Sequence, residues 1–479
     1  MNSGRRRQVL FGLLLWCVAS LCLFLGWKAF WFLCDDAYIA FRYVSNSQFG
    51  WGYTWNPPPF RPVEGYTSFL WVVLLDGTWS VLGVEPPDSA NWISLVLSMG
   101  SLGLMVAMGM QVRLSDQMER WRWLLLSVML AGTLSNRTFL AWTSSGLEAA
   151  LVTFLILLWL YVGLFLPRRR HWTACMGVVA ALLALARPDG LLFVAALICM
   201  ICVRSARDKR QMAASLFGLM PLLFVGAHLC WRYYTYGYWL PNTYYAKHVA
   251  IWPLAGITYL AAFLVEYAFW VWLLVLGVAT AHCWPKNTTW RRWALDGWTD
   301  ETLVRAVVSG TVVAHFAYYT FSVGGDHFEY RIYHHLVPLL WLTLPLICDR
   351  MGWTAQRIAM VSLLMLVFGL PIPWVHWAHT KDLSEREQTY ALRYKVAPHF
   401  PWVIRWYPLA FDALQEWLIG RFVGTRHQGH KVFWHYQLAR FPTREEGLKI
   451  TGEEYPVFAG VPVGVPAWVL PRVAIIDTQ

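Results

Sequence analysis

The sequence predicts an all-α polytopic membrane protein with about eleven transmembrane helices, one juxtamembrane helix and a small C-terminal lobe outside the membrane. Of its 479 residues, 57% are apolar and only 14% are charged, whereas soluble domains carry about 25% charged residues. Apolar runs long enough to cross a bilayer recur along the chain. Too few polar residues remain to cover a soluble fold. The net charge of +11 fits the loops of a membrane protein better than nucleic-acid binding.

The first apolar run, 9–33, is 25 residues long and follows three arginines at 5–7. It is too long for a signal peptide and lacks a cleavage site, so we expect an uncleaved first span. The next run, 66–83, is interrupted by Asp76 and Gly77 and is expected to lie along the membrane interface. The other ten spans are expected at 90–111, 122–140, 147–166, 172–186, 190–203, 212–231, 255–280, 302–320, 335–348 and 358–374.

The distribution of basic residues predicts the orientation of these spans. If 66–83 does not cross, the loops expected on the cytoplasmic side carry 18 Lys and Arg residues, and the outer loops before residue 375 carry seven. Cytoplasmic loops are enriched in basic residues. We therefore expect a bacterial inner-membrane protein with a cytoplasmic N-terminus and an extracytoplasmic C-terminus. The unusual polar clusters then all lie on the outer side, which predicts one extracytoplasmic site.

Two regions are expected. Residues 1–375 form the membrane domain, with a first outer loop at 34–89, and residues 376–479 form the lobe. Within the lobe, helices are expected around 383–395, 409–421 and 427–438, and a strand at 472–477. The nine cysteines show no CxxC pair or metal-ligand spacing, so neither a disulfide framework nor a metal motif is predicted.

Two adjacent carboxylates, Asp35 and Asp36, follow the first span directly. Carboxylates at a bilayer edge are costly unless they have a function or a partner. Adjacent side chains point in different directions, so we expect one of them to act as general base on an acceptor hydroxyl and the other to bind a hydroxyl, a cation or an arginine. The alternative is a pair that anchors the helix end among lipid headgroups.

Other polar residues are candidates for binding substrate. Glu64 is either a ligand of substrate hydroxyls or a charge that caps the interfacial helix. The turn Arg187–Gly190 joins two short spans, so it is expected to lie below the outer surface and to line a cavity; a shallow turn in a thinned bilayer is the alternative.

A phosphate leaving group requires cations where negative charge develops. The candidates are Lys247, Arg187, Arg331, His327 and the pair His334 and His335, and Arg331 is preferred because it lies five residues after Asp326 and just before a span. Asp35, Asp36 and Asp326 offer the oxygen ligands that Mg²⁺ or Ca²⁺ takes, which leaves a divalent cation open.

Five motifs occur in order: DDAYIAFRY (35–43), VEGYTSFLW (63–71), ARPDG (186–190), LPNTYYAK (240–247) and GGD (324–326). Together they resemble a family of bacterial GT-C-type membrane glycosyltransferases that includes mycobacterial and Pseudomonas arabinofuranosyltransferases. The resemblance runs from about residue 9 to 340 and implies a GT-C fold, a polyprenyl-phosphate-linked sugar donor and catalysis by Asp35 or Asp36. It implies donor-site roles for Arg42, Glu64, Tyr66, Arg187, Asp189, Asn242, Tyr245, Lys247, Asp326, His327 and Arg331.

The predicted function is transfer of a sugar, most consistent with D-arabinofuranose, from polyprenyl phosphate to an extracytoplasmic acceptor such as a cell-envelope glycan or a pilin. Inversion and retention at the anomeric carbon both remain open. The alternative is a flippase or transporter of lipid-linked sugar. Against it, the chain shows no internal symmetry, and its polar clusters gather on one face instead of at the membrane midplane. A scaffold without a site leaves the Asp35–Asp36 pair unexplained.

Overall fold

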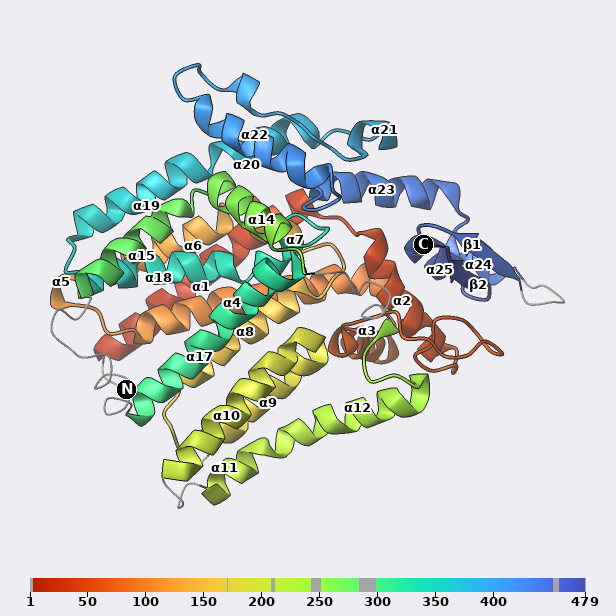
Figure 1. Ribbon diagram of the computed structural model, residues 1–479, viewed down its shortest axis with the longest axis horizontal. Coiled ribbons are helices and arrows are strands. Elements are labelled where there is room, and N and C mark those ends of the chain that lie inside the picture. The colour runs from red at the N-terminus through yellow and green to blue at the C-terminus, as the bar shows by residue number, and fades with distance from the viewer. Residues whose placement is uncertain are drawn as a thin grey trace.

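The protein is a bundle of helices with a small lobe at one end (Figure 1). The computed structural model describes residues 3–169, 171–207, 212–242, 251–283, 299–450 and 456–478. The N-terminus lies at one end of the bundle and the last strand lies beyond the other end. We call the second of these the lobe end.

The bundle is built from the apolar segments of the sequence. Its elements are α1 (Ser3–Phe30), α4 (Pro86–Gln111), α5 (Asp116–Glu119), α6 (Arg122–Leu134), α7 (Arg137–Trp142), α8 (Ala149–Leu164), α9 (Trp172–Ala186), η1 (Pro188–Gly190), α10 (Leu191–Arg207), α11 (Met212–Leu219), η3 (Met220–Leu222), α12 (Leu223–Tyr236), α14 (Pro253–Glu266), α15 (Trp270–Cys283), α17 (Asp300–Ala317), the π-helical turn η4 (Tyr318–Val323), η5 (Arg331–Tyr333), α18 (Leu336–Arg350), α19 (Ala355–Gly369) and α20 (Pro371–Thr380).

The lobe end carries shorter elements. They are α2 (Asp35–Gln48), α3 (Phe69–Leu82), α21 (Arg386–Thr389), η6 (Ala397–His399), α22 (Trp406–Ile419), α23 (His427–Arg440), α24 (Arg444–Leu448), β1 (Val457–Gly460), α25 (Gly464–Val469) and β2 (Ala474–Asp477).

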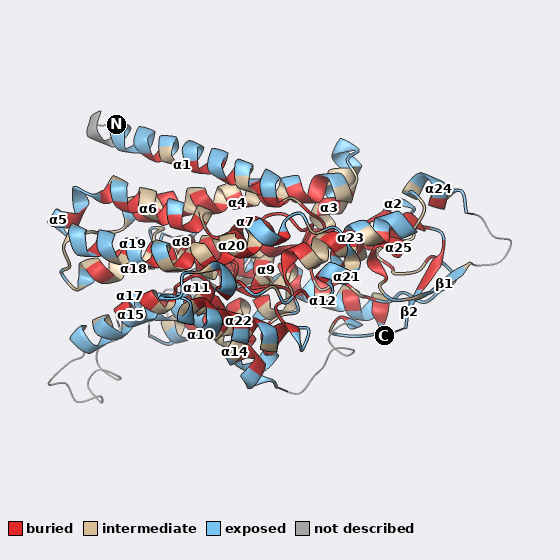
Figure 2. Ribbon diagram, turned by 90° about the horizontal axis from the view of Figure 1, so that it is seen from above, coloured by how far each residue is buried: buried red, intermediate tan, exposed pale blue. Residues whose placement is uncertain are grey.

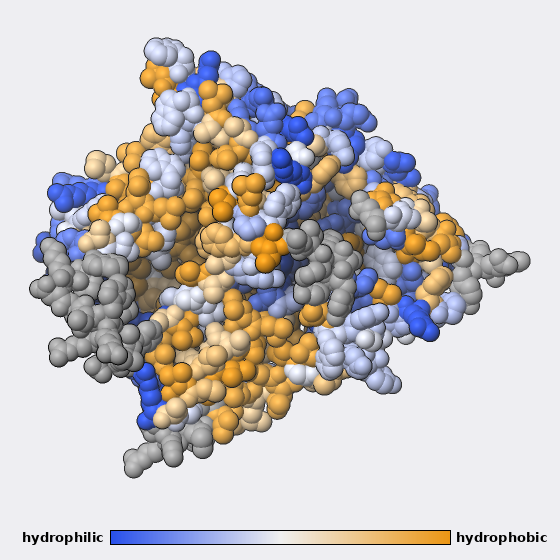
Figure 3. All heavy atoms as spheres, viewed as in Figure 1, coloured by the Kyte–Doolittle hydropathy of each residue, from blue (hydrophilic) through white to orange (hydrophobic). Residues whose placement is uncertain are grey.

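The all-α polytopic prediction is confirmed. Among the described residues, seven helical segments are long and apolar enough to cross a membrane. They correspond to the expected spans at 9–33, 90–111, 190–203, 212–231, 302–320, 335–348 and 358–374. Three other expected spans coincide with the shorter apolar helices α6, α8 and α9, and the last coincides with the pair α14 and α15. Figure 3 shows an apolar band across the bundle between more hydrophilic ends.

The segment expected to form one span at 255–280 is broken, because α14 and α15 meet at an angle of 98°. Ala268, in the break, has φ +54°, a left-handed conformation that ends a helix. The carbonyl of Tyr267 lies against Gly369, where an added Cβ would come within 2.6 Å of its oxygen. The bend is therefore fixed by packing against α19, which no local sequence pattern reveals.

Helix α1 runs along the edge of the bundle (Figure 2). Only 17% of the residues in its most apolar 18-residue stretch are buried. Its exposed side chains are large and apolar, among them Leu10, Phe11 and Leu14. Such a surface is stable against lipid and unstable against water, which accords with a membrane span.

Described parts of the loops with the expected cytoplasmic arginines lie near one another at the N-terminal end (Figure 1). Arg168 and Arg204 both pair with Asp300, with N–O distances of 3.3 and 2.6 Å. The backbone N–H of Ser115 donates to the Asp349 carboxylate at 3.0 Å. The two sets of loops therefore lie at opposite ends, as the alternation of spans predicts. Which compartment each end faces remains a prediction.

The segment expected to lie along the membrane interface forms a helix of 14 residues, α3, and its position at the interface remains a prediction. Asp76, which interrupts its apolar pattern, accepts hydrogen bonds from the Ser47 hydroxyl at 2.9 Å and the Tyr53 hydroxyl at 2.8 Å. This polar side attaches α3 to the end of α2.

In the lobe, the helices expected at 409–421 and 427–438 are present as α22 and α23. The segment expected at 383–395 forms only the single turn α21, and Ala391 just beyond it has φ +50°. The expected strand is β2, which pairs in parallel with β1 from Val457 with Ala474 to Gly460 with Asp477. Between these strands, α25 packs on α2. The C-terminal segment is thereby brought to the residues that follow the first span.

Candidate active site

The first turn of α2 places the two aspartates. Backbone hydrogen bonds between Cys34 and Ser145, at 3.1 Å, and between Ser145 and Phe32, at 2.9 Å, hold the short turn after α1. Helix α2 then begins at Asp35, so both carboxylates lie in its first turn. Negative charge is favoured there by the helix dipole. Both residues line one cavity, but their carboxylates differ in hydrogen bonding.

Asp35 attaches the lobe to the bundle. Its carboxylate oxygens accept the backbone N–H groups of Gly464 at 3.1 Å and Val465 at 2.9 Å. Only 7% of the residue is exposed. Burial raises the pKa of Asp35 to about 7, against the opposing effect of these hydrogen bonds. A carboxylate whose two oxygens are held in this way fits an anchoring role better than proton transfer from a substrate.

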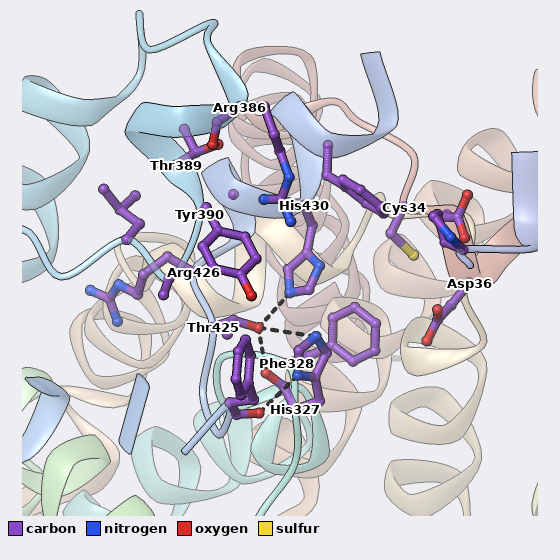
Figure 4. A pocket seen from close by; sticks show the side chains of 17 residues that line it. Cys34, Asp36, His327, Phe328, Arg386, Thr389, Tyr390, Thr425, Arg426 and His430 are labelled. Carbon is purple, nitrogen blue, oxygen red and sulfur yellow. Dashed lines mark hydrogen bonds between the residues drawn. The ribbon is translucent and has the colours of Figure 1, made fainter. Parts of the chain in front are cut away.

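Asp36 is exposed and lines a cavity of about 190 Å³ between α2, the loop after η4 and the lobe. Its carboxylate makes no hydrogen bond or ion pair within the described parts of the chain. In Figure 4 it lies across the cavity from Thr425 and His430. Asp35 lines the same cavity, but both of its carboxylate oxygens accept backbone N–H groups. Asp36 is therefore the better candidate to accept a proton from a hydroxyl group in this cavity.

The opposite wall is a junction between bundle and lobe. The backbone N–H of Gly424 donates to the Asp326 carbonyl at 2.8 Å, and that of Thr425 donates to the His327 carbonyl at 2.8 Å. The Thr425 hydroxyl lies 2.8 Å from Nε2 of His430. Burial lowers the pKa of His430 well below its usual range, so a neutral imidazole faces the cavity. His327, a predicted site residue, is exposed here and is held by the Phe422 carbonyl at 2.8 Å.

Sequence reasoning missed a cation on the lobe side. The Arg386 guanidinium carbon lies 4.8 Å from the ring centre of Tyr390 and 4.5 Å from that of Phe433, and all three residues line the cavity. His430 was missed as well. Nothing in the local sequence separates these two residues from solvated loop residues, because only the fold brings them opposite Asp36.

Arg331 packs beside Phe328, a residue in the wall of this cavity. Its Nε and Nη2 donate to the Asp326 carboxylate at 2.8 and 3.3 Å, and its guanidinium carbon lies 4.3 Å from the ring centre of Phe328, which lines the larger cavity. Arg331 also lines a cavity of about 20 Å³ together with Arg187 and His335. Its Nη1 makes no hydrogen bond to any described residue, so one face of the guanidinium remains able to bind an anion.

Arg187 and Asp189 of the Arg187–Gly190 turn line the smaller cavity, and the depth of this turn in a membrane remains a prediction. Arg187 donates to Glu148 at 2.6 Å, to the Tyr319 hydroxyl at 2.6 Å and to Asp189 at 3.0 Å. Asp189 also lies 2.7 Å from Nε2 of His315. Each guanidinium nitrogen of Arg187 already has a protein partner, so Arg187 is less available to a phosphate than Arg331.

Arg42 requires a correction, because the structure gives it a structural place instead of the expected substrate site. The side chain is fully buried, and its guanidinium donates to five backbone carbonyls at 2.8 to 3.1 Å. The acceptors are Trp55, Ala467, Leu470, Pro471 and Val473. The residue joins the first outer loop to the C-terminal segment.

Three further predicted residues meet in a separate cluster, and none of them lines the Asp36 cavity. Glu64 is buried against Arg232 at 2.9 Å, and the Tyr66 hydroxyl lies 3.3 Å from that of Tyr236. Burial raises the pKa of Glu64 to about 7, although Arg232 opposes the shift. The backbone N–H of Asn242 donates to the Glu64 carbonyl at 3.0 Å. The other two predicted residues of this motif, Tyr245 and Lys247, lie outside the described residues.

His334 is also a structural residue. It is buried, with Nδ1 2.6 Å from the Thr153 hydroxyl and Nε2 3.0 Å from the Phe139 carbonyl. Both ring nitrogens are therefore occupied. His335 is buried too, beside the smaller cavity.

A buried ionic network supports the wall of the cavity. Arg426 pairs with Glu266 at 2.8 Å and with Glu329 at 3.2 Å, and Arg137 pairs with the same two carboxylates. All four side chains are at most 2% exposed. The network ties α7, the end of α14 and the start of α23 to Glu329, which follows Phe328. Its members are far apart in sequence, so no motif could reveal it.

A divalent cation stays an untested expectation. Within the described ranges, no three His, Cys, Asp or Glu side chains converge as metal ligands. Asp35 is bonded to backbone N–H groups and Asp326 to Arg331. The three predicted oxygen donors thus do not form one ligand set here.

We expect Asp35 to make stability depend on pH. Its pKa of about 7 lies above the ordinary value of 3.8, so between these values the folded chain holds a proton that the unfolded chain releases. This contribution is complete below pH 4 and is lost as the pH rises through 7. The unfolding temperature measured in detergent should fall as the pH rises from 5 to 8, and Asp35→Asn should reduce this fall. Equal pH profiles for both proteins would contradict the assignment.

Comparison with known proteins supports the fold. No family model matches the chain, and no curated protein does. The chain resembles the crystal structure of ArnT from Cupriavidus metallidurans bound to undecaprenyl phosphate, with a TM-score of 0.54 and 13% identity over 97% of this chain and 85% of that one. ArnT is a polytopic all-α membrane protein of the GT-C type. At this level of identity the likeness shows a shared fold.

Proposed function

We propose that this protein is a GT-C-type membrane glycosyltransferase that moves a sugar from polyprenyl phosphate to an acceptor. The observation that carries the proposal is Asp36, an exposed carboxylate that faces a cavity and makes no hydrogen bond or ion pair to a described residue. The fold shared with ArnT, whose structure holds undecaprenyl phosphate, supports the class of donor.

In the proposed reaction, the acceptor hydroxyl lies in the cavity beside Asp36. The Asp36 carboxylate takes the hydroxyl proton while the oxygen attacks C1 of the donor sugar. The bond between C1 and the phosphate oxygen breaks, and polyprenyl phosphate leaves with the electron pair. Arg331, which packs against Phe328 in the wall of this cavity, stabilises this charge through its Nη1, which makes no hydrogen bond to a described residue. A single displacement of this kind inverts the anomeric carbon.

The finer proposal follows the family resemblance. The sugar is D-arabinofuranose, and the acceptor is a cell-envelope glycan or a pilin. The cavity opens on the extracytoplasmic side of a bacterial inner membrane, and the N-terminus is cytoplasmic. The excess of basic residues in the loops at the N-terminal end supports this orientation.

The proposal is tested with purified protein, polyprenyl-phosphate-linked arabinofuranose and a candidate glycan or pilin acceptor. Release of free polyprenyl phosphate together with a glycosylated acceptor is expected. If labelled donor crosses the bilayer of reconstituted vesicles and no sugar is transferred, the protein is a transporter and the proposal is wrong.

Substitution of Arg331 should separate donor binding from folding. Arg331→Gln removes the positive charge at the leaving phosphate, so we expect kcat/KM for the lipid-linked donor to fall by about 10- to 100-fold, as the loss of a charge-assisted contact of about 1.5–3 kcal/mol implies. Steady-state kinetics with varied donor concentration measures this. Arg421→Gln is the matched control, because Arg421 is exposed and stacks on Trp417 away from the cavity. Equal losses of kcat/KM in Arg331→Gln and Arg421→Gln would contradict the role of Arg331 at the leaving phosphate.

A further inference from the structure

An exposed apolar strip begins α22 and the turn before it. Trp402 is 82% exposed, Val403 60%, Trp406 67% and Leu409 52%, and Arg405 among them is exposed as well. Large apolar side chains that are adjacent and exposed usually mark a surface that contacts something. We call residues 402–409 the lobe strip.

Tyr407 of the lobe strip packs where α15 begins and where α19 ends, and both are apolar helices of the bundle. The Tyr407 hydroxyl accepts a hydrogen bond from the Trp270 indole at 2.9 Å, and the Tyr407 ring centre lies 5.5 Å from that of Phe368. Trp270 is the first residue of α15 and Phe368 is next to the last residue of α19. Helix α22 packs on α14 in the same region, as Figure 1 shows.

The lipid-facing surface of the bundle continues to this position. On α19, Met360 is 65% exposed, Leu363 60% and Val367 55%. On α15, Leu274 is 61% exposed. Because Tyr407 touches both helices, the exposed tryptophans of the lobe strip adjoin this lipid-facing surface.

The composition of the strip fits a membrane interface. Tryptophan and tyrosine are enriched at membrane interfaces because one part of the ring system is apolar and another forms hydrogen bonds. A short segment with aromatic and aliphatic side chains and a basic residue matches an interfacial anchor. Arg405, whose guanidinium donates to the Phe400 carbonyl at 3.1 Å, supplies the positive charge.

We propose that the lobe strip inserts into the headgroup region of the leaflet at the lobe end and anchors the lobe to the bilayer. The occupant of this surface is therefore phospholipid, not a second protein. The inference depends on the membrane-spanning fold and not on the proposed glycosyltransferase activity. It adds a second attachment for the lobe, independent of the bonds that Asp35 and Arg42 make.

Photo-crosslinking tests the proposal directly. p-Benzoylphenylalanine replaces Trp402 or Trp406 in the full chain, in vesicles of phosphatidylethanolamine and phosphatidylglycerol. Irradiation should give phospholipid adducts, detected by mass spectrometry, at a yield at least about tenfold above that of a water-exposed position. Leu363 is the lipid-facing control, and exposed Glu445 on α24 is the water-facing control within the lobe.

Both positions are exposed, so the substitutions should leave the fold intact, and size-exclusion chromatography verifies this. Adducts at Trp402 or Trp406 comparable with those at Leu363 support the anchor. If Leu363 gives adducts while Trp402 and Trp406 give no more than Glu445, or crosslink to protein instead, the proposal is overturned.

Discussion

Asp36→Asn should lower the rate of sugar transfer by about 10²- to 10⁴-fold, the usual contribution of a positioned general base. The amide keeps the size of the side chain but cannot take a proton from the acceptor. Asp36 makes no hydrogen bond or ion pair to any described residue, so the substitution should change neither the fold nor the affinity for the donor lipid. The measurement is kcat, compared with donor binding and with thermal stability on the same samples.

Asp35→Asn is the matched control, since it changes the neighbouring carboxylate in the same way. We expect it to weaken attachment of the lobe, because only one carbonyl oxygen remains for the N–H groups of Gly464 and Val465. Folded Asp35→Asn protein should still transfer sugar. If Asp36→Asn retains the original rate and folded Asp35→Asn protein is inactive, the two roles must be exchanged.

The spans and the location of the site could be predicted because their signals are local. Hydrophobicity summed over about twenty residues identifies a membrane span. Two charged carboxylates directly after such a span can be recognised in the sequence without knowledge of their contacts. The same reasoning brought Asp326, His327 and Arg331 to the candidate site, where His327 and Arg331 line cavities.

The sequence could not predict which aspartate anchors the lobe and which is left for catalysis, because this depends on residues that are distant in the sequence. The backbone groups that hold Asp35 lie 429 and 430 positions further along the chain. Arg386 and His430 reach the cavity only through the fold of the lobe. The bend at Ala268 is likewise set by packing against Gly369, about a hundred residues away. Periodicity carries no information about such contacts.

The role of Arg42 likewise depends on contacts with distant segments that the local sequence does not reveal. In the sequence it extends the polar face that follows the first span, and the family resemblance implies that it binds the donor. In the structure its guanidinium is fully buried among backbone carbonyls of the first outer loop and the C-terminal segment. A buried carbonyl that loses its donor costs about 1–3 kcal/mol, and several lose it together here.

Arg42→Ala should therefore detach the C-terminal segment from α2 and destabilise the protein by about 3–5 kcal/mol, similar to the removal of one partner from a buried charged network. Thermal unfolding and limited proteolysis measure this, and we expect new cleavage in residues 456–478. Arg42→Lys keeps the charge but lacks the planar guanidinium that reaches carbonyls on two segments. We therefore expect it to be more stable than Arg42→Ala but less stable than the unmodified protein. The opposite result would be an unchanged unfolding temperature and an unchanged cleavage pattern, together with a higher KM for the donor. Arg42 would then bind substrate, as the resemblance implied.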